Sequence, residues 1–239
     1  MDYIFILSAL ILFFASFTQG LTGFGFAMVA IPLLSFIMDI KEAIPLVALF
    51  GLVNNTYLII KLKAHVEYRE LKSLIIGAVL GIPLGALFLS KAEPGLIEII
   101  LGIIILIFVL FTNFNLIKQK EISLNWGYMF GALSGLFGGA FNINGPPVLI
   151  YFYIMGWDKF KLKASITGFF IFSSITIVAM HIATGVTTQK VFFNFIYILP
   201  VVIAGMIIGY NLFHKVSTKL YNRIILIGLT IIAISMILR

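Results

Sequence analysis

The stretch "GLFGGAFNINGPPVLIY", Gly135 to Tyr151, places glycines, two asparagines and a double proline inside one of the most apolar regions of the chain. The apolar run that contains it, Trp126 to Met155, would be about 45 Å long as a single helix, whereas the hydrocarbon core of a bilayer is about 30 Å thick. Glycine and proline also weaken helix interiors. We therefore predict that this run is broken near its asparagines.

The composition is that of an integral membrane protein. Of 239 residues, 62% are hydrophobic and only 10% are charged, and the mean hydropathy is +1.16. Too few polar residues are present to cover a water-facing globule. The chain has no cysteine, which excludes disulfides and thiolate metal sites. The net charge of +7 comes from lysines scattered over short loops. We interpret these lysines as signals of membrane topology and expect no nucleic-acid partner.

A second broken run lies near the N-terminus, in Tyr3 to Met38. Its segment "GLTGFGFAMVAIPLL" (Gly20 to Leu34) aligns without a gap with Gly135 to Leu149 at an offset of 115. Later in the chain, "GIPLG" (Gly81 to Gly85) aligns with "GMIIG" (Gly205 to Gly209) at a larger offset. The chain is therefore predicted to hold two repeats in a single membrane domain, 1–120 and 121–239.

Between these runs, further apolar segments have the length of full transmembrane helices. They are 44–60, 71–90, 96–111, 162–183, 191–213 and 220–238. The predicted fold is an all-α polytopic membrane protein of two inverted repeats, each with a broken re-entrant helical hairpin and three transmembrane helices. Dividing either long run in two gives hairpin arms of about 15 residues or more, and the sequence leaves open whether such arms span the bilayer.

The charges decide the orientation of the repeats. If each broken run crosses the membrane once, Lys and Arg divide eight to eight, against the positive-inside rule. If each is a hairpin, twelve lie on one side and four on the other. The twelve are Lys61, Lys63, Arg69, Lys72, Lys118, Lys120, Lys159, Lys161, Lys163, Lys215, Lys219 and Arg223, and the four are Lys41, Lys91, Lys190 and Arg239. We expect a multi-pass protein of the cell (inner) membrane with both termini on the non-cytoplasmic side.

Non-helical backbone inside a bilayer occurs only where protein or a wet cavity surrounds it. A helix that begins at such a break presents unpaired N–H groups and the positive end of its dipole, an arrangement that attracts an anion. No Lys or Arg lies deep in a predicted helix, so amides, hydroxyls and dipoles would hold the anion. The candidate substrate-binding residues are Gln19, Thr22, Gly23, Phe24, Gly25, Asn54, Asn55, Asn142, Asn144, Gly145, Pro146, Ser173 and Ser174. Packing between helices is the alternative role for the small polar residues among them.

His181 is the ionisable residue predicted to lie well inside a helix. It is a candidate for proton coupling, and the alternative is a histidine that only makes an interfacial hydrogen bond. We find no HExxH motif and no close acidic pair at depth, so we expect neither an enzyme nor a metal or other cofactor.

With both glycine-rich blocks in view, the chain resembles the sulfite exporter TauE/SafE family of membrane permeases over nearly its whole length. The blocks that carry the resemblance are Gly20 to Leu34 and Gly135 to Tyr151. The resemblance implies export, or in some members uptake, of small sulfur-containing anions such as sulfite and organosulfonates. Asn142 and Asn144 stand where many members carry more glycine, a departure that bears on the choice of substrate.

The leading hypothesis is a secondary transporter that carries a small oxyanion by alternating access around two opposed helix breaks. The alternatives are a passive anion channel, an uptake permease for another small anion, and, least favoured, an intramembrane enzyme. The expected partners are the anion and the lipid bilayer. Coupling to a proton or counter-ion and assembly as a homodimer are left open by the sequence.

Overall fold

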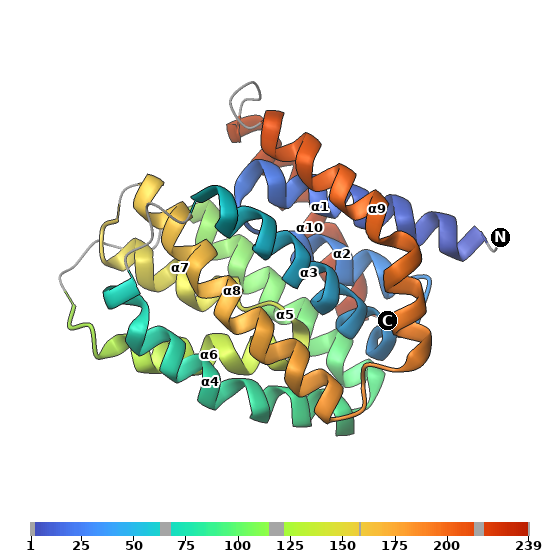
Figure 1. Cartoon of the computed structure of the whole chain (residues 1–239), viewed down its shortest axis with the longest axis horizontal. Helices are drawn as coiled ribbons and strands as arrows, with labels where there is room; N and C mark the ends of the chain where they lie inside the picture. The colour runs from blue at the N-terminus through green and yellow to red at the C-terminus, as the bar shows by residue number, and fades with distance from the viewer. Residues whose placement is uncertain (1–2, 63–67, 115–121, 158, 213–217, 239) are drawn as a thin grey trace. The chain divides into compact units, whose positions relative to one another are not determined.

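The structure is a computed structural model that describes residues 3–62, 68–114, 122–157, 159–212 and 218–238 (Figure 1). Within these ranges the chain is helical and has no strand, which confirms the predicted all-α class. The helices are α1 (Tyr3–Thr22), α2 (Phe26–Leu34), α3 (Ile40–Leu62), α4 (Tyr68–Lys91), α5 (Pro94–Phe114), α6 (Trp126–Phe141), α7 (Gly145–Ile154), α8 (Lys159–Ala183), α9 (Gln189–Leu212) and α10 (Thr218–Leu238). Lys63, Lys118, Lys120, Lys215 and Arg239 lie outside the described residues.

Six of the described helices are long and apolar enough to cross a membrane: α1, α3, α4, α5, α8 and α9. Five of them match long helices predicted from the sequence, and each extends the predicted range by a few residues at one or both ends. The sixth, α1, belongs to the first broken run. The last predicted helix is present as α10, whose part from Leu226 to Leu238 is a shorter apolar helix. The chain is therefore a multi-pass membrane protein.

Both long apolar runs are divided into a longer and a shorter helix. In the first run α1 has 20 residues and α2 has 9, and in the second α6 has 16 and α7 has 10. The expected arms of about 15 residues or more were too long for α2 and α7, because each break lies closer to the end of its run than to the middle. At 1.5 Å per residue α2 and α7 are only about 14 to 15 Å long, half the thickness of a hydrocarbon core.

The chain divides into two compact units that do not coincide with the two halves of the sequence. Unit 1 contains residues 1–54, 92–114 and 187–239, and unit 2 contains residues 55–91 and 115–186. Each unit takes segments from both halves. These units do not test the division into sequence repeats, which rests on similarity along the chain.

In unit 1, α1 packs closely along α9, and α5 packs on α10. The first contact depends on glycine. A Cβ atom on Gly205 would lie 2.5 Å from the carbonyl oxygen of Phe13, and one on Gly209 would overlap the carbonyl oxygen of Phe17. From the other helix, a Cβ atom on Gly20 would lie 2.6 Å from the carbonyl oxygen of Met206. Glycine lets these two backbones touch, as small residues do between membrane helices.

In unit 2 the corresponding contact is made by α4 and α6, which lie side by side. Glycine recurs at every fourth position on both helices, and an added Cβ atom at these positions would overlap backbone atoms or the Ser73 side chain of the other helix. These glycines are Gly77, Gly81 and Gly85 on α4 and Gly127, Gly131, Gly135 and Gly139 on α6. The spacing places all of them on one helix face, so the sequence pattern itself forms the contact surface.

The two contacts correspond residue by residue. Gly81 and Gly85 approach the backbone of Ala132 and Leu136, whereas Gly205 and Gly209 approach that of Phe13 and Phe17. The correspondence between α1 and α6 is therefore an offset of 119 (from 13 to 132), not the 115 of the sequence alignment. The helix ends agree, because the left-handed residues that follow α1 and α6 are Gly23 and Asn142, again 119 apart. Apolar helices with recurrent glycine align almost equally well when shifted by one turn, which explains the four-residue error.

Candidate functional site

The break between α1 and α2 is a short loop that contains two left-handed glycines. Gly23 has a φ of 85° and Gly25 a φ of 92°, values that side chains with a Cβ atom rarely adopt. A Cβ atom on Gly25 would meet only the Cγ2 atom of Thr18, at 3.8 Å. The backbone conformation, not crowding, therefore requires glycine here.

Thr22 and Phe24 stabilise this loop. The Thr22 hydroxyl lies 2.9 Å from the carbonyl oxygen of Thr18 and 2.7 Å from that of Phe24, and it accepts the Phe24 N–H at 3.3 Å. The Phe24 ring is half-buried and packs edge-on against Phe108, with 6.5 Å between the ring centroids. The Thr22 hydroxyl is thus bonded to the neighbouring backbone and stabilises the conformation of the loop.

A cavity of about 60 Å³, which we call the break cavity, adjoins the loop within unit 1. Its lining consists of Thr18, Thr22, Phe24, Gly25, Met28, Val29, Phe108, Thr112, Leu226 and Leu229. The helix α2 begins at this cavity, directly after Gly25. The first four N–H groups of a helix have no acceptor within it, so the start of α2 brings backbone donors and the positive end of a helix dipole to the cavity.

Gln19 and Asn54 form a buried polar pair in the same unit. The Asn54 amide donates to the side-chain oxygen of Gln19 at 3.1 Å, and the Ser16 hydroxyl lies 3.1 Å from Asn54 Oδ1 and 2.8 Å from the carbonyl oxygen of Val202. Gln19 and Asn54 are at most 3% exposed. Buried amides need such partners. Neither residue lines the break cavity, so the structure links them to helix packing between α1, α3 and α9.

The break between α6 and α7 has a different backbone. Asn142 is left-handed, with φ 52° and ψ 21°, and its N–H donates to the carbonyl oxygen of Gly138 at 2.8 Å. This is the capping geometry in which glycine is usual and asparagine is the common substitute. Asn142 therefore ends α6, a role that sequence reasoning did not assign to it.

Asn144 connects this break to α8. Its side-chain amide donates to the Ser173 hydroxyl at 2.6 Å, and its carbonyl oxygen accepts a hydrogen bond from Ser134 of α6. Ser134 is fully buried and was not among the predicted residues. The signal that could have found it is a lone hydroxyl in the apolar, glycine-rich face of α6.

Asn55 and Ser174 form a second polar contact in unit 2. The Asn55 amide lies 3.4 Å from the Ser174 hydroxyl and 3.5 Å from the carbonyl oxygen of Phe170. Ser173 and Ser174 both bond to the Phe170 carbonyl of their own helix as well. Asn55 of α3 and Asn144 of the second break thus meet the same turn of α8.

Gly145, Pro146 and Pro147 form the first turn of α7 and are buried. A Cβ atom on Gly145 would meet the Phe170 ring at 3.6 Å, which is ordinary contact. Proline has no N–H, so α7 presents fewer backbone donors than α2 does. On this ground the first break is the better candidate for an anion site, although both were predicted alike.

His181 lies fully buried on α8. Its Nε2 atom is 2.8 Å from the carbonyl oxygen of Gly139 in the last turn of α6. A carbonyl oxygen can only accept, so Nε2 carries a hydrogen. The His181 side chain therefore contacts the backbone of the helix turn that precedes the second break. No described group of three or more His, Asp or Glu side chains could hold a metal ion.

The family model for the sulfite exporter TauE/SafE matches residues 8–236 of this chain. A curated relative is the probable sulfite/organosulfonate exporter TauE of Cupriavidus necator, which is 22% identical over 203 residues, covering 81% of this chain and 78% of the relative. No solved structure matches the chain. With glycine-rich breaks in both long apolar runs and a family match that spans nearly every helix, the chain belongs to the sulfite exporter TauE/SafE family of membrane transporters.

Proposed function

We propose that this protein is a secondary transporter that exports a small sulfur-containing oxyanion, such as sulfite or an organosulfonate. The proposal is supported by the family and by the relative named as a probable sulfite/organosulfonate exporter. The transported anion leaves chemically unchanged, so the proposed activity is not enzymatic.

The observation that carries the proposal is the start of α2 at the break cavity. Backbone N–H groups and a helix dipole of about half a positive charge meet a cavity there. The N–H groups of Gly23 and Phe24 bond to the Gln19 carbonyl oxygen and the Thr22 hydroxyl, so the donors proposed for the anion are those of the first turn of α2. The described lining holds no charged side chain. A site of dipoles alone binds modestly and releases readily, as transport requires.

The proposed mechanism is alternating access around the two glycine-rich helix breaks, with the two halves of the sequence as inverted repeats. The matching glycine contacts of α1 with α9 and of α4 with α6 support a repeated structural unit. Both termini are proposed to lie on the non-cytoplasmic side, because that orientation places twelve of sixteen Lys and Arg residues in the cytoplasm. We also propose that His181 couples transport to a proton, which is tested by measuring uptake with and without a pH gradient.

The test is uptake of labelled sulfite, sulfate, thiosulfate and methanesulfonate into proteoliposomes, with and without a pH gradient. Saturable uptake of one anion, inhibited by the others, is expected. Uptake of none of them by protein that is shown to be folded would refute the proposal. A current that grows linearly with concentration, far above carrier turnover, would indicate a channel instead.

A pair of variants tests the role of α2. Ala27 is half-buried in the first turn of α2. Ala27→Pro removes one N–H from that turn, where proline is tolerated, while Ala27→Ser keeps it. We expect Ala27→Pro to raise the KM for the anion about tenfold, the effect of losing one hydrogen bond to a charged group. The serine variant should behave as the wild type, and equal KM values in both variants would exclude α2 as the anion site.

A further inference from the structure

A second cavity in unit 1 lies at the other end of α1. It has a volume of about 350 Å³ and is separate from the break cavity, with which it shares no lining residue. The lining residues are Ile4, Phe5, Ser8, Ile37, Met38, Asp39, Glu42, Leu46, Lys190, Asn194 and Ile198. Ser8 here and Thr18 of the break cavity lie about 15 Å apart along α1. We call it the Lys190 cavity.

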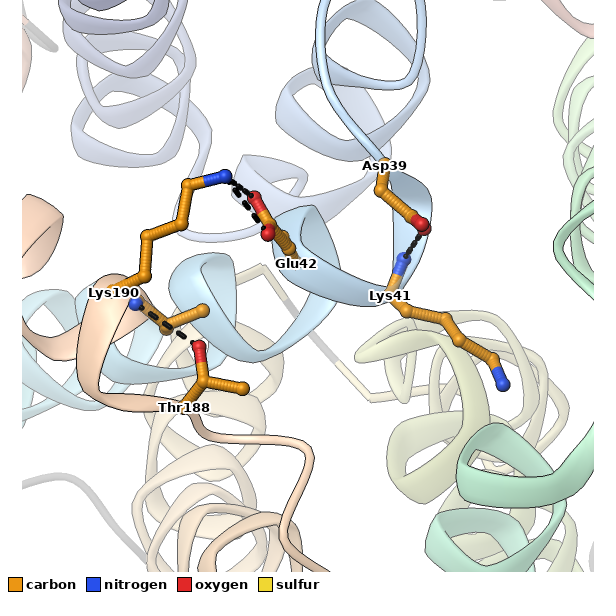
Figure 2. A network of polar contacts seen from close by, with 6 residues as sticks. Asp39, Lys41, Glu42, Thr188 and Lys190 are labelled. Atoms are coloured by element: carbon orange, nitrogen blue, oxygen red, sulfur yellow. Dashed lines mark hydrogen bonds and ion pairs between the residues drawn. The ribbon is translucent and has the colours of Figure 1, made fainter.

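Lys190 makes a two-pronged ion pair at this cavity. Its Nζ atom lies 2.9 Å from Glu42 Oε1 and 2.8 Å from Glu42 Oε2 (Figure 2). The Lys190 side chain is 67% exposed and that of Glu42 is 29% exposed. Ion pairs this exposed contribute little to folding stability. The pair is therefore easily exchanged, and the cation is its more accessible partner.

Polar side chains at or near the cavity also cap the starts of two helices. The Asp39 carboxylate accepts the N–H of Lys41 at 2.8 Å at the start of α3, and Thr188 accepts the N–H of Val191 at 3.4 Å at the start of α9 (Figure 2). Both helices thus begin beside the cavity with their positive dipole ends. With Asp39 bound to its own helix, Glu42 is the carboxylate that neutralises Lys190.

We infer that the Lys190 cavity is a binding site for a small oxyanion at the non-cytoplasmic end of the transport route, in which Glu42 occupies Lys190 until the anion replaces it. The Glu42 carboxylate presents two oxygen atoms to one ammonium group, as a sulfite or sulfonate group would. The cavity has room for such a group. Its volume of about 350 Å³ is near the lower end of the range for small-ligand pockets, which begins at about 300 Å³. This inference rests on the proposed transport of an anion, and it adds a binding site distinct from the break cavity.

The first experiment measures occupancy of Lys190 without transport. The full-length protein in detergent is acetylated with an amine-reactive ester, and the acetylation rate of Lys190 is followed by mass spectrometry in methanesulfonate and in chloride at equal ionic strength. Methanesulfonate should slow the acetylation of Lys190 in a saturable way. Lys41 serves as the internal control, because its side chain points away from the ion pair (Figure 2).

In Glu42→Gln protein, the same protection should occur at about tenfold lower methanesulfonate concentration, because the competing carboxylate is gone. An unchanged or higher half-protecting concentration in this variant, or no protection of Lys190 in the wild type, would overturn the inference. Protection that persists in protein without uptake activity would leave the site standing and refute only the transport proposal.

The second experiment asks whether substitution of Lys190 and substitution of Glu42 change the KM for sulfite in opposite directions. For sulfite uptake, Lys190→Gln should raise KM about tenfold, Glu42→Gln should lower it, and Lys41→Gln should leave it unchanged. A merely structural ion pair would shift both partners' variants in the same direction and lower their thermal stability together. If the cavity bound a cation instead, Lys190→Gln would lower KM and Glu42→Gln would raise it. Either result would overturn the inference.

Discussion

His181 donates a hydrogen bond from Nε2 to the carbonyl oxygen of Gly139, 2.8 Å away on another helix. In a continuous helix the N–H of Ile143 would bond to this oxygen. Here the Ile143 N–H lies 3.4 Å from the carbonyl oxygen of Phe137 instead, because α6 ends at left-handed Asn142. His181 therefore satisfies a helix-end carbonyl that the break leaves without its intrahelical donor.

Replacement of His181 should separate this structural role from proton coupling. His181→Ala removes the donor and should destabilise the protein by about 1–3 kcal/mol, the cost of an unsatisfied buried polar group. His181→Gln can place an N–H near the position of Nε2 and should lose less. Thermal unfolding in detergent checks both values. If His181 couples transport to protons, His181→Gln should be nearly as stable as the wild type yet lose the response of uptake to a pH gradient.

Asn142 should tolerate glycine better than alanine. Its left-handed conformation (φ 52°) costs about 1–2 kcal/mol for a residue with an ordinary Cβ atom and nothing for glycine. We expect Asn142→Ala to lower the free energy of unfolding by about that amount and Asn142→Gly to retain it. If Asn142→Gly folds but transports poorly, the side-chain amide has a further role in binding the anion. Equal stability of the two variants would argue against the capping role.

Two glycines of the second apolar run, one within α6 and one at the start of α7, should respond differently to alanine. A Cβ atom on Gly131 would overlap the carbonyl oxygen of Leu74, whereas one on Gly145 would meet the Phe170 ring at 3.6 Å. Gly131→Ala should therefore cost about 1–3 kcal/mol, as overpacking does, and Gly145→Ala should be close to neutral. Thermal unfolding of the pair checks this contrast. Comparable losses in both would contradict the close contact of α4 with α6.

Asn144 and Ser173 should be energetically coupled. Their side chains are 2.6 Å apart, and hydrogen bonds between membrane helices contribute about 0.6 kcal/mol on average. A double-mutant cycle with Asn144→Ala and Ser173→Ala should give a coupling energy of about that size. A matched cycle with Asn144→Ala and Thr176→Val should give none, because Thr176 bonds to Phe172 of its own helix. Coupling in the second cycle and not in the first would disprove the contact.

The absence of cysteine makes the proposed orientation directly measurable. Single cysteines introduced as Lys41→Cys and Lys190→Cys should react with a membrane-impermeant thiol reagent added outside intact cells. Lys72→Cys should react only after the cells are opened. The reverse pattern would place both termini in the cytoplasm, and a Lys190→Cys that reacts from the same side as Lys72→Cys would exclude the hairpin interpretation of the charges.

Much of the fold could be predicted from local sequence. The membrane class follows from composition, and five long helices follow from apolar runs of suitable length, because both depend on residues that are neighbours in the chain. The first turn of α7 at Pro146 and Pro147 is also local, since proline suits that position. The glycine spacing on α4 and α6 was visible too, but its meaning as a contact surface required the partner helix.

The register of the two breaks is a case where the sequence misled. Alignment matched Gly20 with Gly135, whereas the left-handed residues that end the helices are Gly23 and Asn142. The alignment rewarded identical glycines that pack helices, and it could not recognise that an asparagine takes the place of a glycine at a helix end.

The sequence by itself determined that the chain lies in a membrane, where its long helices are, and that both broken runs carry glycine. Only the tertiary structure decided which side chains meet. Asn144 bonds to a serine 29 residues away, His181 to a carbonyl 42 residues away and Lys190 to a glutamate 148 residues away. These pairings depend on how helices rotate and slide against one another, which backbone contact at glycine controls and local residue preference does not.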